Sequence, residues 1–273
     1  MDLRIVNTCN NNCLYCLEQS YRNKQKYIDK KIIFSEIENN FDKNITFYGG
    51  NPLFHPDLGD IIIYSKSNGF ESIGLLTNGF GLSSSVLDNL VNLGLNSIGI
   101  YFNCFDEEKH NLIVNGGIKL IELIDVLTLL NNNKIFTKII IHINKQNINT
   151  IYKDILILNK KFGITTFEFI NYFPFDRPYD LYKKYLEFSE LENRVYINKI
   201  FFVIEKLNLK TSFVKFSKSF FGKNKFYYDF NNGVLKQIGE EDIMRLDTIE
   251  KPFCFLESRC NNCFIRDNCK FYE

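Results

Sequence analysis

The stretch Thr8–Cys16, TCNNNCLYC, organises the chain. Its cysteines, Cys9, Cys13 and Cys16, have the spacing C-x3-C-x2-C and follow closely on the apolar-leaning run Leu3–Val6. Iron–sulfur clusters are held by cysteine thiolates, whereas structural zinc usually takes four protein ligands. Three thiolates on one loop at a strand end therefore predict a 4Fe–4S cluster in which one iron has no protein ligand. A zinc knuckle or a set of structural cysteines is the alternative.

Length and composition limit the class of protein to which this loop belongs. The chain has 273 residues, 45% of them hydrophobic, which is enough for one α/β barrel or for two small domains. Its 33 basic and 32 acidic residues nearly cancel, so overall charge indicates no polyanionic partner. The start has no signal-peptide pattern, and no apolar run reaches the ~18 residues of a membrane span. With eight cysteines in such a chain, we expect a cytoplasmic protein, no membrane partner, and metal ligation in place of disulfides.

Apolar runs with strand character alternate with helical patterns along most of the chain. The expected strands are 2–7, 44–48, 72–77, 97–103, 136–143 and 164–171. The expected helices are 28–40, 57–68, 83–93, 117–132, 150–162 and a longer one within 180–207. This alternation predicts parallel βαβ units in an α/β fold. A partial (β/α)6 TIM-like barrel fits better than an eight-stranded one, which takes ~250 residues for the barrel alone.

Three parts follow from this reading. Residues 1–177 form the barrel core, 178–224 a helical and then irregular connector, and 225–273 a small cysteine-rich extension. In such folds the chemistry sits on loops at the carboxyl ends of the strands. We therefore give most weight to polar residues that directly follow a predicted strand.

Several such residues follow the second, third and fifth strands. They are Gly49, Gly50, Asn51, Thr77, Asn78 and Asn144. A glycine pair lets the backbone approach a ligand closely, and small polar groups at a strand end can reach a bound nucleoside. Plain turns are the alternative.

The cysteine spacing, with Tyr15 just before the last cysteine, resembles the signature of the radical S-adenosylmethionine (SAM) enzymes. In that family the open iron chelates SAM, and one electron from the cluster releases a 5′-deoxyadenosyl radical that abstracts hydrogen from a substrate. The resemblance implies that Cys9, Cys13 and Cys16 bind the catalytic cluster, and that Tyr15 lies near the adenine. It also implies that Gly49, Gly50, Asn51, Thr77, Asn78 and Asn144 line SAM.

The family's Gly-Gly-Glu-Pro segment, which contacts the amino group of SAM, corresponds here to Gly49-Gly50-Asn51-Pro52. Asn51 thus replaces the family acid. Its amide oxygen still accepts a hydrogen bond, but without the charge-assisted part.

A second cysteine group closes the sequence and consists of Cys254, Cys260, Cys263 and Cys269. Four closely spaced thiols permit structural zinc or a second cluster. The preceding segment 226–236 has Asn-Gly at a predicted hairpin turn. A hairpin followed by these cysteines resembles the SPASM/twitch-like extension of the family, which implies an auxiliary 4Fe–4S cluster. We choose that cluster over zinc.

Three other features have modest interpretations. Cys104 is expected to be a small buried residue, with hydrogen donation to a substrate radical as the alternative. His142, within an apolar strand, is expected to be a core histidine. The segment 206–225 has six lysines, interleaved phenylalanines and no acid. A solvated lysine face over a phenylalanine core is favoured there over a nucleic-acid surface.

The resemblance implies a radical SAM enzyme that matures a ribosomally made peptide or protein by a crosslink, a thioether or epimerisation. A partner protein is expected to present the substrate, and an external donor to supply electrons. We expect no nucleic-acid partner, although a modifier that uses 206–225 is one alternative. The others are a small-molecule or carbohydrate enzyme and a non-catalytic iron–sulfur scaffold, which the replacement at Asn51 encourages.

Overall fold

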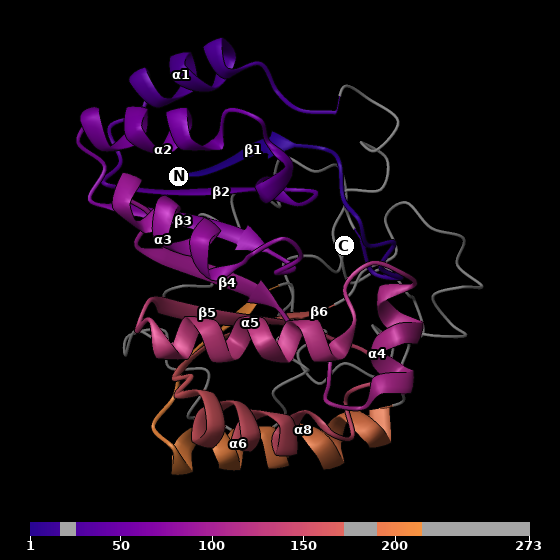
Figure 1. The fold of residues 1–273 in the computed structure, drawn as a ribbon. Helices are drawn as coiled ribbons and strands as arrows, with labels where there is room; N and C mark the ends of the chain where they lie inside the picture. The colour runs from indigo at the N-terminus through magenta and orange to yellow at the C-terminus, as the bar shows by residue number, and fades with distance from the viewer. Residues whose placement is uncertain (17–25, 172–189, 215–273) are drawn as a thin grey trace, which may run out of the picture.

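The computed structural model describes residues 1–16, 26–171 and 190–214 (Figure 1). Within these ranges the chain forms one seven-stranded sheet with the order β1-β2-β3-β4-β5-β6-β7, and every neighbouring pair is parallel. The strands are β1 Asp2–Val6, β2 Asn44–Gly49, β3 Ser72–Thr77, β4 Ser97–Tyr101, β5 Phe136–Ile143, β6 Thr166–Asn171 and β7 Lys210–Val214. The predicted carboxyl-terminal hairpin and the four cysteines 254–269 lie outside the described residues.

Each pair of successive strands is connected through at least one helix, and Figure 1 shows these helices from α1 at the top to α6 and α8 at the bottom, with α4 beside one end of α5. They are α1 Lys30–Glu38, α2 Leu58–Ser67, α3 Ser84–Leu93, α4 Glu107–Val114, α5 Leu120–Asn132, α6 Ile151–Phe162 and α8 Glu190–Lys206, with the 3-10 turn η2 at Pro52–Phe54. No described helix is long and apolar enough to span a membrane. The expected fold class, an α/β partial TIM-like barrel, is confirmed.

Local sequence signals explain where the helices begin and end. The Ser83 side chain accepts a hydrogen bond from the N–H of Val86 at the start of α3, which satisfies one of the donors that a helix leaves unpaired at its start. The same helix stops at Gly94, whose φ of +127° suits glycine. Leu87 and Leu90 point from α3 into the core.

The two faces of the sheet differ in chemistry. Alternate residues, such as Ile139 and Ile141 on β5, are fully buried in the apolar core beneath the helices. The residues between them lie on the opposite face, where Lys138 Nζ forms an ion pair with Glu168 Oε2 at 2.7 Å and Arg4 lies over the Tyr48 ring. Side chains alternate between faces along a strand, so the interior of the partial barrel has a partly polar lining.

Two elements differ from the prediction. β7 falls within 210–214, which the sequence reading treated as irregular, so the sheet has seven strands where six were predicted. Its five residues include the buried polar Thr211 and Ser212, which hide the apolar pattern. Helix α4 was not predicted; it follows Asp106, whose carboxylate accepts a hydrogen bond from Lys109 N and so caps the start of the helix.

Candidate metal centre

The loop with the three cysteines lies along the carboxyl end of α4. The N–H groups of Asn12 and Leu14 donate to the carbonyls of Val114 and Ile113, at 3.0 and 2.9 Å. The last carbonyls of a helix have no partner within the helix, so the loop satisfies two of them. The N–H of Cys16 then donates to the carbonyl three residues earlier at 3.1 Å, which closes the loop in a turn. The loop's backbone is thus held by an element about 100 residues away.

A chain of side-chain amides fixes the other side of the loop. Asn78 Nδ2 donates to Asn10 Oδ1 at 2.9 Å, and Asn10 Nδ2 donates to Asn11 Oδ1 at 3.0 Å. The same Asn11 oxygen accepts the N–H of Ile118 at 3.0 Å. Asn78 Nδ2 also lies 3.7 Å from Cys9 Sγ, within range of an N–H···S hydrogen bond. The amides therefore link the β3 end, the cysteine loop and the loop before α5.

The predicted glycine pair approaches the cysteine loop itself. A Cβ on Gly50 would lie 2.1 Å from the carbonyl oxygen of Thr8, and one on Gly49 would lie 2.0 Å from that of Val6. The close approach allows Gly50 N to donate to Val6 O at 2.9 Å and Asn51 N to donate to Thr8 O at 2.8 Å. Here the glycines bring β2 against the start of the cysteine loop, and their contact with SAM remains a prediction.

Asn51, in place of the family acid, is fully buried. Its Oδ1 accepts from Thr77 Oγ1 at 2.8 Å and from Leu53 N at 3.3 Å, while its Nδ2 donates to Phe80 O at 3.0 Å. Thr77 Oγ1 in turn accepts the N–H of Gly79 at 3.0 Å. A carboxylate could not donate to the Phe80 carbonyl, so these partners account for an amide at this position. Its predicted contact with the SAM amino group stays a prediction.

Tyr15 projects from the cysteine loop into the barrel and is buried. Its ring stacks on His142 with centroids 4.0 Å apart and planes 13° apart. His142 also stacks with Tyr101, at 6.1 Å. Burial, reinforced by the nearby Cys13 sulfur, raises the pKa of the Tyr15 phenol well above its ordinary value. His142 is therefore buried as predicted, but it lies on the inner face beside the cysteine loop and not beneath the helices.

Asn144 follows β5 and is fully buried. Its Nδ2 donates to His142 O and its Oδ1 accepts from Gln146 N, both at 2.9 Å. Nearby, Asn147 Nδ2 donates to Asn103 O at 3.2 Å. Asn103 is 3% exposed, and its Oδ1 has no hydrogen-bond partner among the described residues. A buried oxygen of this kind costs free energy until a donor reaches it, so the mouth of the barrel at β4 suits a polar ligand.

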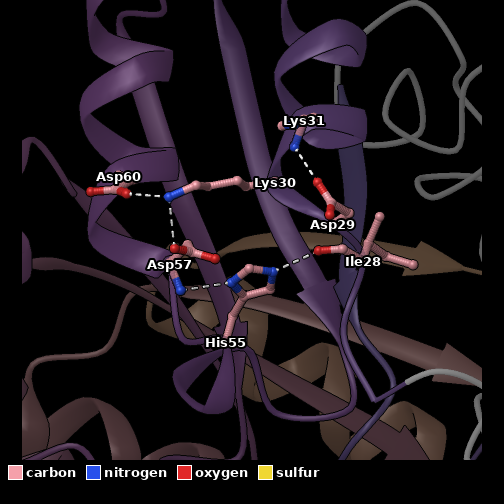
Figure 2. A network of polar contacts seen from close by, with 7 residues as sticks. All are labelled: Ile28, Asp29, Lys30, Lys31, His55, Asp57 and Asp60. Atoms are coloured by element: carbon pink, nitrogen blue, oxygen red, sulfur yellow. Dashed lines mark hydrogen bonds and ion pairs between the residues drawn. The ribbon is translucent and has the colours of Figure 1, made fainter.

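A second polar network secures the β2–α2 loop to the segment that returns from the cysteine loop (Figure 2). His55 Nε2 contacts Ile28 O at 2.9 Å, and His55 Nδ1 accepts from Asp57 N at 3.1 Å. These partners require a neutral ring with its proton on Nε2. Lys30 Nζ bridges Asp57 and Asp60, at 2.9 Å each. His55 thus has a structural position between the β2–α2 loop and residue 28.

Cys104 is buried, as expected of a small core residue, and its Sγ donates to Asp106 O at 3.4 Å. Burial raises the pKa of its thiol to about 12, which disfavours the thiolate. In the 206–225 segment, Phe213 is buried in the core. That position agrees with the predicted phenylalanine core; residues 215–225 lie outside the described ranges.

The donor set fits an iron–sulfur cluster. Cys9, Cys13 and Cys16 are half-buried on one anchored loop, and none of them is in a disulfide with another described cysteine. Within the described ranges, no three cysteine, histidine or acidic side chains form a group that could hold a single metal ion. Cysteine thiols are the ligands that hold iron–sulfur clusters.

Sequence reasoning missed several residues that build this site. They are Asn10, Asn11, Ile113, Val114 and Gly117. A Cβ on Gly117 would lie 2.0 Å from Asn11 Oδ1, so only glycine allows the loop before α5 to approach the cysteine loop. The dense run of asparagines in 10–12 was a usable signal, because amides both donate and accept.

Comparison with known proteins now defines the family. The profile described as Radical SAM superfamily matches residues 3–157, more than half of the chain. The chain therefore belongs to the radical SAM superfamily, a family that implies a 4Fe–4S cluster and SAM. The SPASM/twitch-like assignment of the carboxyl-terminal part is not established by this match.

Curated relatives include proteins named for a nucleotide reaction. The chain is 28% identical over 116 residues to the GTP 3',8-cyclase of Chlorobaculum tepidum, covering 41% of this chain and 34% of that protein. It is 25% identical over 206 residues to the probable GTP 3',8-cyclase of Saccharolobus islandicus, covering 73% of this chain and 65% of that protein. The chain thus matches less than two thirds of either relative's length.

Solved structures with the same fold include proteins bound to peptides. SuiB of Streptococcus suis, in complex with SAM, superposes with a TM-score of 0.62 at 15% identity, over 81% of this chain and 51% of SuiB. The structure of anSMEcpe with AdoMet and the Kp18Cys peptide gives 0.61 at 16% identity, over 75% and 60%. At these identities the similarity is one of fold.

Proposed function

We propose that this chain is an enzyme that binds a 4Fe–4S cluster through Cys9, Cys13 and Cys16 and uses it to cleave SAM. The observation that carries the proposal is the double anchoring of the cysteine loop, by α4 carbonyls on one side and by Asn78 on the other. When bound, the cluster and SAM supply the one-electron chemistry that generates a carbon-centred radical. The chain's own residues hold the thiols in place and limit the access of water.

The polar residues at the mouth are proposed to receive SAM. Asn103 offers a buried oxygen with no donor among the described residues, and Tyr15 and His142 form a buried aromatic wall. Gly49, Gly50, Asn51, Thr77, Asn78 and Asn144 frame this mouth. Preorganised groups of this kind orient a cofactor and exclude competing reactions.

We propose a peptide or protein as the substrate, presented by a partner protein, with electrons from an external donor. The peptide complexes of SuiB, bound to its precursor SuiA, and of anSMEcpe share the fold and support this choice.

GTP is the second candidate, because the relatives with detectable sequence similarity are GTP 3',8-cyclases. A four-cysteine auxiliary cluster at Cys254, Cys260, Cys263 and Cys269 belongs to either proposal. These cysteines lie outside the described residues.

The decisive experiment is anaerobic incubation of the reconstituted protein with SAM and dithionite. We expect 5′-deoxyadenosine from the wild type and none from Cys9→Ala. An intact cluster without 5′-deoxyadenosine would favour the scaffold alternative. To test the substrate, peptides encoded by neighbouring small reading frames are co-expressed with the enzyme and their masses are measured by mass spectrometry. GTP is tested in parallel as the second candidate substrate. Conversion of GTP with unchanged peptide masses would replace the peptide proposal.

A further inference from the structure

Asn78 occupies an unusual position beside one of the three thiols. It is 6% exposed, and its amide is oriented by the backbone, because Asn78 Oδ1 accepts the N–H of Phe80 at 3.0 Å. An amide oxygen fixed in this way settles which end of the side chain is the nitrogen. The nitrogen must therefore face the cysteine loop.

Both hydrogens on that nitrogen are then donated in hydrogen bonds. One points to Asn10 Oδ1 at 2.9 Å, and the other to Cys9 Sγ at 3.7 Å. Asn10 is itself held by Asn11, whose oxygen also accepts from Ile118 N. The donor to Cys9 is thus positioned by a partly buried chain of hydrogen bonds.

We infer that Asn78 is a redox-positioning residue, which donates an N–H···S hydrogen bond to the Cys9 thiolate and makes the cluster easier to reduce. Hydrogen bonds to the sulfurs are among the factors that set the reduction potential of iron–sulfur clusters. Reduction adds one electron to the cluster, and a donor aimed at a thiolate stabilises the added negative charge. This inference rests on the proposed function, because it requires the cluster to be held by Cys9. It gives the Asn78 side chain a role toward the cluster, in addition to the place of Asn78 beside the proposed SAM site.

The test is a redox titration of the reconstituted holoprotein without SAM, monitored by electron paramagnetic resonance. Asn78→Ala should make the one-electron reduction about tenfold less favourable, which equals a midpoint about 59 mV lower. The matched control is Asn96→Ala. Asn96 also bridges two strands through its amide, to Ile73 N and Glu71 O, but it lies at the far edge of the sheet. Its midpoint should equal that of the wild type.

An Asn78→Ala protein with full iron and sulfide content and the wild-type midpoint would overturn the inference. If the Asn78→Ala variant binds no cluster, the hydrogen bond is tested on the wild-type protein instead. Selective 15N labelling of asparagine should give a hyperfine coupling in the reduced cluster, and its absence would refute the hydrogen bond. A wild type that binds no 4Fe–4S cluster would remove the proposed function as well, whereas SAM cleavage with an unchanged midpoint would remove only the role of Asn78.

Discussion

The two edges of the sheet handle polar groups in opposite ways. At the carboxyl edge, five asparagines are at most 6% exposed: Asn51, Asn78, Asn103, Asn144 and Asn147. At the amino edge, Lys43 and Glu71 form an ion pair whose side chains are 72% and 67% exposed. Neutral amides donate and accept at once, so they can satisfy one another without the desolvation cost of a charge. The buried edge is the one that frames the cysteine loop.

Gly50→Ala should break the carboxyl edge most severely. Its Cβ would lie 2.1 Å from a backbone oxygen that cannot move without shifting the cysteine loop. We expect a loss of about 3 kcal/mol of stability, as for severe overpacking, and failure to assemble the cluster. Urea unfolding and iron quantification measure both. The control is Gly81→Ala, where the added methyl meets open space and only a φ of +88° is strained, at about 1 kcal/mol.

Thr77→Val should sharpen the comparison by removing one hydroxyl from the same edge. The Asn51 oxygen loses one donor and the Gly79 N–H loses its acceptor, so we expect a cost of about 2 kcal/mol. Thr128→Val removes an exposed hydroxyl bonded only within α5. It should cost under about 0.5 kcal/mol. Equal losses in the two variants, measured by denaturant titration, would contradict the proposed importance of the buried edge.

Substitution of Asp154 measures how much a buried carboxylate near the carboxyl edge changes the stability of the protein. Burial raises the pKa of its carboxyl to about 6. The folded state therefore holds the proton more tightly than the unfolded state, and this stabilising effect is lost as pH rises from about 4 to 6. Asp154→Asn should be more stable than the wild type at pH 8 by about 2 kcal/mol, with little difference at pH 4.

Urea titrations at the two pH values measure this difference. Asp88→Asn, on the exposed surface of α3, is the matched control and should behave as wild type at both. A pH-independent effect of Asp154→Asn would show that the ionised carboxyl is not destabilising.

Lys43→Ala should have the smallest effect, since it opens an exposed ion pair at the amino edge. Exposed pairs of this kind contribute little to stability and are screened by salt. We expect the smallest loss of stability of these variants, and a loss that shrinks further in 1 M NaCl. A larger loss would remove the contrast between the two edges.

Strands could be predicted from the sequence where their residues are buried on both faces of the sheet. The run Ile139–Ile143 reads as a strand because a parallel sheet beneath helices needs continuous apolar residues. Strand β7 was not predicted because two of its five residues, Thr211 and Ser212, are polar yet buried. For the candidate site, the cysteines and strand-end residues could be named, but not their partners. The bond between Asn11 and Ile118 spans 107 positions, and no local pattern encodes such a pairing.

The hydrogen bonds from the cysteine loop to Ile113, Val114 and Ile118 also set an order of events during synthesis. The chain leaves the ribosome amino terminus first, so the thiols emerge long before the segments that secure them. Asn78 and then the turn at Gly117 are synthesised after Cys9, and only then are the surroundings of Cys9 complete. The hydrogen bonds of the cysteine loop are therefore complete only after residue 118 has left the ribosome, and a nascent chain arrested earlier would expose the three thiols without these partners.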